Sequence, residues 1–178
     1  QRSLINASTT GTPPTDPFYS FPDSNWWYFK GHQVFNGLAQ FGTVTTAKTP
    51  TIAVIDDSFD TDAAAWDRPN YLTGKVFLNC TGVNVGCTTG SDVRPKTTDP
   101  APTNTDSHGT STAGVIGATI NNTTGVSGFA PFAKILPYKV TVTSGAAADF
   151  SVATAIRDAK NNASVDAINV SLASNANG

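Results

Sequence analysis

The order of apolar segments after residue 50 limits what this chain can fold into more than any other feature. An apolar run at 51–55 ends in two aspartates, and apolar runs at 135–140 and 165–172 follow it. Small and apolar residues at helical spacing lie between these runs, at 110–120 and 150–161. Strand, helix, strand, helix, strand requires right-handed crossovers, which place helices on the faces of a parallel sheet. We therefore expect an α/β protein with a parallel central sheet.

The segments outside this alternation are expected to be less regular. Residues 1–50 begin with Thr, Pro, Asn and Ser and continue with a block of aromatic residues. This pattern predicts an N-terminal arm that packs onto the core, with a carbohydrate-binding platform as the alternative for the aromatic block. Residues 61–105 contain several prolines and are expected to form loops.

Composition argues against two classes of partner. Charged residues make up 13% of the chain, and 11 Lys and Arg stand against 13 Asp and Glu without a basic cluster. Nucleic-acid binding therefore has little support. No run of 18 apolar residues is present, so we expect no membrane partner either.

The two cysteines and the first residues indicate a secreted protein. Cys80 and Cys87 lie close together in a Gly-, Thr- and Asn-rich segment, which favours a small disulfide loop and an oxidising compartment. A metal site is the weaker alternative, because His32 and His108 are distant in sequence. The chain starts without Met or an apolar leader, as expected of a mature, processed product or of an edited sequence.

An aspartate and a histidine are expected at the carboxyl ends of the parallel strands, where α/β proteins place their active sites. Asp56 follows the first apolar run, and His108 starts the first helical segment after Asp106 and Ser107, which can cap it. We expect the helix N-terminus to keep His108 neutral. An aspartate that orients a neutral histidine is two thirds of a nucleophile-activating system. For an isolated pair of this kind, a purely structural role is the commoner outcome.

The sequence around these two residues resembles the subtilisin-like serine proteases, or subtilases. Residues 51–60 resemble the strand that carries the catalytic Asp in that family, and residues 106–118 resemble the helix that carries the catalytic His. Residues 121–131 are similar to the loop after that helix, and residues 167–173 to the strand that lines the substrate groove. The four motifs occur in the family's order.

The resemblance implies the N-terminal portion of a three-layer subtilisin-like fold, with 51–178 as the N-terminal half of a catalytic domain. It also implies hydrolysis of peptide bonds. Asp56 would orient the imidazole of His108, which would act as general base and then as general acid. The substrate groove would be lined on one side by Ser171, Leu172 and Ala173, and on the other by Ser144, Gly145 and Ala146.

Three positions depart from the family's pattern. Asp57 stands where Ser or Thr is usual, as in the proprotein-processing branch. It would either help to bind a basic peptide residue or face solvent, and we favour solvent. Ser58 and Ala173 each replace a usual Gly, which affects the backbone beside Asp56 and the width of the groove.

The family's nucleophile is absent from these 178 residues. No Gly-Thr-Ser-Met-Ala-type motif follows His108, and the Ser of Gly109–Ser111 belongs to the histidine helix itself. We therefore expect zymogen processing that leaves a C-terminal half as a separate chain, which carries the Ser and covers the open edge of the last strand. The alternative is a catalytically inactive binding or scaffold protein.

The loop after the histidine helix is a candidate calcium site by the same resemblance. Calcium prefers carbonyl and carboxylate oxygens. The matching positions are Ile120, Asn122, Thr124 and Val126, and Asp16, Asp62 or Asp67 would supply a carboxylate. A turn closed by hydrogen bonds alone is the alternative. We expect no catalytic cofactor.

Overall fold

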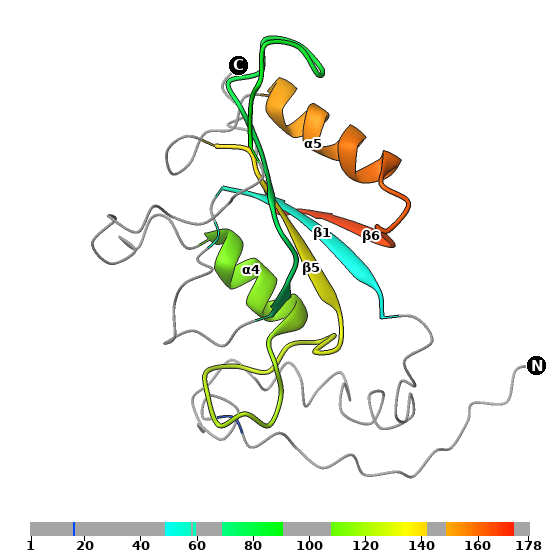
Figure 1. The fold of residues 1–178 in the computed structure, drawn as a ribbon. Coiled ribbons are helices and arrows are strands. Elements are labelled where there is room, and N and C mark those ends of the chain that lie inside the picture. The colour runs from blue at the N-terminus through cyan, green and yellow to red at the C-terminus, as the bar shows by residue number, and fades with distance from the viewer. Residues whose placement is uncertain are drawn as a thin grey trace, which may run out of the picture.

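A parallel-centred sheet with one helix on each face forms the described part of the molecule (Figure 1). The computed structural model describes residues 16, 49–57, 59, 69–90, 108–141 and 149–172. The elements in these residues are β1 (Thr51–Asp56), β2 (Asn70–Tyr71), β3 (Lys75–Leu78), β4 (Thr88–Gly90), α4 (His108–Gly117), β5 (Lys134–Lys139), α5 (Asp149–Asn161) and β6 (Ala167–Val170). Apart from Asp16 and the last two residues, the expected arm over 1–50 lies outside this part.

The strands are arranged in the order β4-β3-β5-β1-β6. β1 pairs in parallel with β5 on one side and with β6 on the other, so the parallel α/β sheet is confirmed. Both β2 and β3 pair in parallel with the edge of β5 that is opposite β1, whereas β4 is antiparallel to β3. The sheet is therefore mixed at that edge rather than parallel throughout.

The prediction of loops over 61–105 is wrong for β2, β3 and β4. β2 and β3 each pair with only two residues of β5, which is too short a contact to produce an alternating pattern in the sequence. β2 and β3 thus form two short pairings along one edge of β5. The centre of the sheet, in contrast, is predicted by the longer apolar runs.

Two apolar layers hold the helices on opposite faces of the sheet. Toward α5, the buried side chains of Ile55 and Tyr138 pack with Ala155 and Ala159. Toward α4, Val54, Phe59 and Ile135 pack with Ala113. α4 approaches closely because its contacting residues are small: a Cβ at Gly117 would lie 3.2 Å from Ile135 Cδ1. The two clusters confirm that helices cover both faces.

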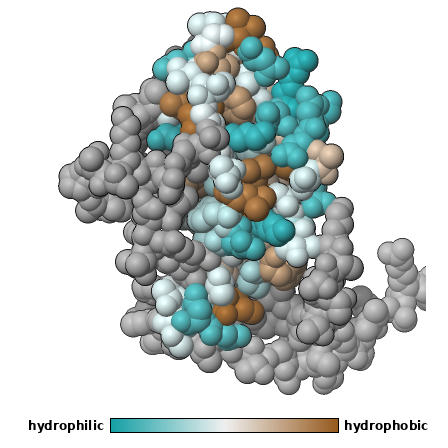
Figure 2. All heavy atoms as spheres, viewed as in Figure 1, coloured by the Kyte–Doolittle hydropathy of each residue, from teal (hydrophilic) through white to brown (hydrophobic). Residues whose placement is uncertain are grey.

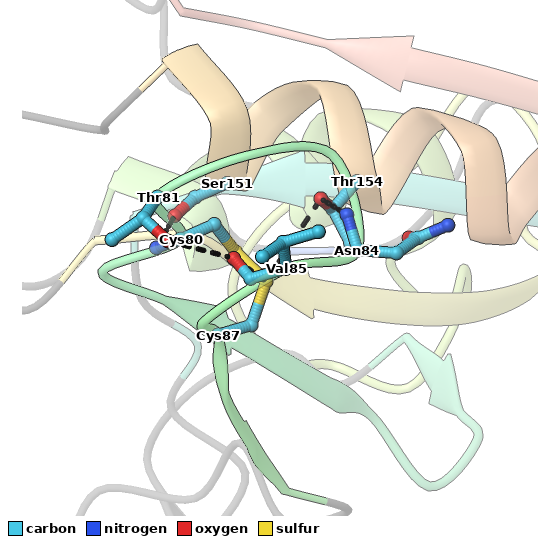
Figure 3. The surroundings of a disulfide bond; sticks show 7 residues. All are labelled: Cys80, Thr81, Asn84, Val85, Cys87, Ser151 and Thr154. Carbon is cyan, nitrogen blue, oxygen red and sulfur yellow. Dashed lines mark hydrogen bonds between the residues drawn. A yellow bond between two sulfur atoms is a disulfide. The ribbon is translucent and has the colours of Figure 1, made fainter.

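The disulfide expected between Cys80 and Cys87 is present and closes a small loop against α5 (Figure 3). The N–H of Cys80 donates to Ser151 Oγ at 3.3 Å, and the N–H of Asn84 donates to Thr154 Oγ1 at 2.9 Å. The hydroxyl groups on one face of the helix thus hold the loop at two points.

A polar cluster also fixes the last turns of α5 to the sheet. The hydroxyl of Tyr138 donates to Asp158 Oδ2 at 2.7 Å, and Lys75 of β3 pairs with the same carboxylate. Burial and the Asp158 carboxylate both raise the pKa of Tyr138, so its hydroxyl stays protonated as a donor.

The outer edge of β6 is open in the described residues. Ile168 and Val170 are 38% and 41% exposed, although their strand pairs with the buried β1. On the face drawn in Figure 2, apolar residues are interspersed with polar ones. In the described segments, no helix has both the length and the apolar character needed to span a bilayer.

Candidate active site

The candidate site begins at the carboxyl end of β1, where the strand leaves the core. Residues 53–55 are fully buried between the two helix layers, and Asp56 follows them with 0% exposure. The N–H of Val140, after β5, donates to the carbonyl of Asp56 at 3.1 Å and continues the ladder of the sheet. Strand pairing therefore carries a carboxylate into a position without access to solvent.

His108 is the first residue of α4, and its ring meets this carboxylate. Nδ1 of His108 lies 2.7 Å from Oδ1 of Asp56. The side chain of His108 is 58% exposed while that of Asp56 is fully buried. The pair predicted from sequence is thus brought together across 52 residues, with the second ring nitrogen of His108 left for another partner.

The electrostatics of the pair differ from the sequence-based expectation. The hydrogen bond to Asp56 raises the pKa of His108 above its ordinary value, and this effect outweighs desolvation. The Asp56 contact thus favours the protonated imidazole, whereas the helix N-terminus was expected to favour the neutral one; the neutral form of His108 stays a prediction. Burial raises the pKa of Asp56, against the lowering by hydrogen bonds from His108 and from the N–H of Asp57. Asp56 Oδ2 is also buried without a hydrogen-bond partner in the described part of the chain.

Asp57 is buried, so the favoured expectation that it faces solvent is wrong. It is 7% exposed, and its Oδ1 accepts a hydrogen bond from the N–H of Gly109 at 3.0 Å. Its own N–H donates to Asp56 Oδ1 at 2.8 Å. Sequence reasoning missed this contact, because Asp106 and Ser107 already offered caps for the helix that starts at His108.

The same three side chains form the one cluster of described residues dense enough to ligate a metal ion. Ligand atoms of Asp56, Asp57 and His108 lie within 4.8 Å of one another. In this arrangement the Asp56 and His108 atoms bond to each other and Asp57 bonds to a backbone N–H. These contacts fit an oriented Asp–His pair.

The residues expected to line the substrate groove are only partly described. Val170 is the register partner of Ile55, so Ser171 follows at the level of Asp56. Its hydroxyl accepts a hydrogen bond from Asn169 Nδ2 at 2.9 Å. Leu172 packs against the cluster on the α5 side of the sheet. The remaining positions lie outside the described residues: Ser144, Gly145, Ala146 and Ala173, together with Ser58, Asp62, Asp67 and the capping residues Asp106 and Ser107.

The candidate calcium loop does bring Asp16 to the segment after α4. Asp16 is fully buried, and its carboxylate accepts hydrogen bonds from the N–H groups of Asn121 and Asn122 at 2.9 and 3.0 Å. The hydroxyl of Ser127 donates to the same carboxylate at 2.8 Å. Successive N–H groups of this kind bind anions.

The hydrogen-bond donors around the Asp16 carboxylate and Asn122 Oδ1 argue against a calcium ion in this conformation of the loop. Asn122 Oδ1, the side-chain oxygen expected to bind the ion, accepts the N–H of Thr124 at 3.0 Å. The loop thus presents hydrogen-bond donors to Asp16, whereas a calcium ion needs oxygens directed at it. The set does not fit the ion in this geometry, and calcium at Ile120, Asn122, Thr124, Val126 and Asp16 stays a prediction.

Comparisons with known proteins agree with this geometry. The model of the subtilase family (Peptidase_S8) matches residues 47–178. Thermitase from Thermoactinomyces vulgaris is 34% identical over 100 residues, which cover 52% of this chain and 35% of thermitase. The chain thus spans about a third of the length of that curated relative. With its buried Asp56, its His108 and its parallel-centred sheet, the chain belongs to the subtilase family and forms the N-terminal part of a subtilisin-like fold.

Proposed function

We propose that this chain supplies the Asp and the His of a secreted serine endopeptidase whose nucleophilic Ser lies on a C-terminal part of the same protease. The observation that carries the proposal is the 2.7 Å contact between the buried carboxylate of Asp56 and the exposed ring of His108. A buried acid that holds one ring nitrogen leaves the other free to exchange a proton with a nucleophile.

The reaction follows from this orientation. Asp56 holds the imidazole with its proton on Nδ1, so Nε2 is the basic nitrogen. Nε2 of His108 takes the proton of the Ser hydroxyl as its oxygen attacks the peptide carbonyl, and then gives that proton to the departing amine. Water repeats the cycle on the acyl-enzyme. Asp56 stabilises the imidazolium in both steps and stays ionised.

The open edge of the sheet supports a C-terminal part that completes the fold. Parallel strands are normally covered on both faces, yet Ile168 and Val170 of β6 are exposed in this chain. The match covers only 35% of thermitase, so most of that relative has no counterpart in the matched part of this chain. A following strand that pairs with β6 would bury these side chains and bring its own residues beside Ser171.

The disulfide supports the secreted location. Cys80 and Cys87 are joined, and disulfides form and persist mainly outside the cytosol. A peptide substrate would add as an extended strand beside the end of β6, through backbone hydrogen bonds. Ser171 is the described residue nearest to that role, because it follows β6 at the level of Asp56.

A fluorophosphonate probe tests the proposal directly. In the complete protease, the probe should label a Ser outside residues 1–178, and His108→Ala should abolish the labelling without unfolding the protein. Asp166→Ala, which alters a carboxylate at the far end of β1, is the control and should label normally. A folded complete protein that neither labels nor cleaves peptides would instead indicate an inactive binding or scaffold protein.

Calcium at the loop after α4 is a separate proposal with its own measurement. Thermal unfolding of the complete protein in EDTA, with and without added calcium, decides it. A Tm that falls in EDTA and returns with calcium in the wild type, but not in Asn122→Ala, would support a loop that rearranges around an ion. An unchanged Tm would indicate that the hydrogen bonds to Asp16, and no ion, stabilise the loop.

A further inference from the structure

Asp57 is a buried carboxylate that the reaction above does not use. It lies directly after β1 and is 7% exposed. Burial of a carboxylate is costly unless hydrogen bonds satisfy it, so the contacts of Asp57 indicate why it is tolerated there. Those contacts lead to both members of the catalytic pair.

The side chain of Asp57 contacts the start of the histidine helix. α4 has no acidic residue in its first turn, although the unpaired N–H groups at a helix start favour a negative charge. The N–H of Gly109, the second residue of the helix, donates to Asp57 Oδ1 at 3.0 Å in a buried contact. The residue directly after β1 therefore places a carboxylate at the start of α4, whose own first turn has none, and bonds to the residue next to His108.

The backbone of Asp57 contacts the acid of the pair. Its N–H donates to Asp56 Oδ1 at 2.8 Å, the same oxygen that meets His108. Its carbonyl accepts the hydroxyl of Thr141 at 3.2 Å, which fixes the orientation of this peptide. One residue is thus bonded to the acid on one side and to the helix start that carries the base on the other.

We propose that Asp57 is a positioning residue, which fastens the first turn of α4 to the end of β1 and thereby sets the geometry of the Asp56–His108 pair. The proposal rests on the peptidase function proposed above. Without this contact, the position of His108 relative to Asp56 would depend on the packing of α4 and on the hydrogen bond between the two side chains. A small displacement of the reacting groups lowers the rate of the reaction strongly.

The charge of Asp57 adds a measurable signature. Asp56 and Asp57, both at the end of β1, are the charged groups that raise the pKa of His108 in the described part of the chain. Neutralising Asp57 removes one of these contributions, so the pKa of His108 falls. The imidazole then loses its proton at lower pH, and the acidic limb of kcat/KM moves to lower pH.

Two substitutions in the complete protease separate the hydrogen bond from the charge. Asp57→Ala removes both, and we expect kcat to fall roughly a hundredfold with little change in KM. Asp57→Asn keeps a carbonyl that accepts the N–H of Gly109, so most of kcat should return while the acidic limb still moves to lower pH. Asp166→Ala and Asp166→Asn are matched controls, because Asp166 Oδ2 accepts the N–H of Thr51 at 3.0 Å at the other end of β1. The controls should change neither kcat nor the limb.

Several results would overturn the proposal. Equal losses of kcat in Asp57→Ala and Asp57→Asn would show that the hydrogen bond to Gly109 does not position the pair. A loss confined to KM, for peptides with a basic residue, would assign Asp57 to substrate binding instead. If Asp57→Ala fails to fold, Asp57→Ser takes its place as the variant without the carboxylate, and a kcat equal to that of Asp57→Asn would count against the proposal.

An NMR titration of the His108 imidazole separates this proposal from the proposed function. A lower imidazole pKa in Asp57→Ala than in Asp57→Asn supports the positioning role at equal charge, because the Asp56–His108 contact is then disturbed when the hydrogen bond to Gly109 is lost. If that result came with no cleavage of peptides, only the peptidase proposal would be overturned. An imidazole pKa that is the same in the two variants would overturn the Asp57 proposal, whatever the activity.

Discussion

The two helices of this chain cover opposite faces of one sheet, yet they are held in place in different ways. α5 carries its own terminal charges, with Asp149 in its first turn and Lys160 in its last. Its side chains also reach outward to the disulfide loop and to the polar cluster around Asp158. α4 has no acidic residue in its first turn and no basic residue in its last, and a carboxylate from β1 bonds to its start.

This difference separates structural from catalytic work. α5 packs on the face of β1 opposite α4, and its polar contacts are with the disulfide loop and around Asp158. The helix that depends on β1 is the one whose first residue must stay 2.7 Å from Asp56. The carboxylate at the start of α4 comes from Asp57, the residue after Asp56. The position of His108 therefore depends on the position of Asp56.

The largest effect should come from the base itself. In the complete protease, His108→Ala removes the proton acceptor for the nucleophile, and kcat should fall by roughly four orders of magnitude or more. The ring is 58% exposed, so the free energy of unfolding should hardly change. Peptide hydrolysis and denaturant unfolding of the same samples measure the two quantities. Retained turnover would contradict the catalytic assignment of α4.

The same contrast explains which parts of the fold the sequence predicts. The centre of the sheet and both helices are predictable, because runs such as 51–55 and the spacing in 150–161 record burial on both sides or on one side. β2 and β3 are not, because each is held by two backbone pairs with one edge of β5. Edge pairing of that length depends on the neighbouring strand and leaves little trace in the side chains.

The residues of the site also differ in how well the sequence predicts them. Asp56 and His108 are predictable because a motif surrounds each of them. The burial of Asp57 is not, because it depends on how closely α4 approaches the end of β1. The hydrogen bond that raises the pKa of His108 was also missed, since the helix start is visible in the sequence whereas the 2.7 Å contact with Asp56 is not.

The second largest effect should come from the close packing after α4. A Cβ added at Gly128 would lie 2.4 Å from the backbone nitrogen of Ala118, where neither atom can move aside cheaply. Gly128→Ala should therefore lower the free energy of unfolding by about 3 kcal/mol, as overpacking does. Gly90→Ala is the control, because its Cβ would meet Val76 at an ordinary 3.6 Å. Equal stability of the two variants would show that the segment after α4 shifts freely.

A somewhat smaller effect is expected on the α5 side, where the disulfide loop is attached. Cys80→Ala combined with Cys87→Ala opens a loop with a sequence separation of 7. The chain-entropy model gives a loss of about 2.5 kcal/mol in the free energy of unfolding. Because the loop contacts α5 and not the catalytic pair, kcat per folded molecule should stay the same. A fall in kcat at full occupancy of the folded state would show that α5 and the site are coupled after all.

The smallest effect gives the sharpest test of the comparison between the helices. Asp149 and Asp57 are both carboxylates at a helix start, but Asp149 belongs to its own helix and is exposed. Asp149→Asn should cost about 0.5 kcal/mol of stability, the usual value for a charge near a helix terminus. It should leave the acidic limb of kcat/KM in place, whereas Asp57→Asn moves that limb to lower pH. If both variants moved the limb equally, His108 would be responding to the net charge of the molecule, and the position of Asp57 between the acid and the base would have no special consequence.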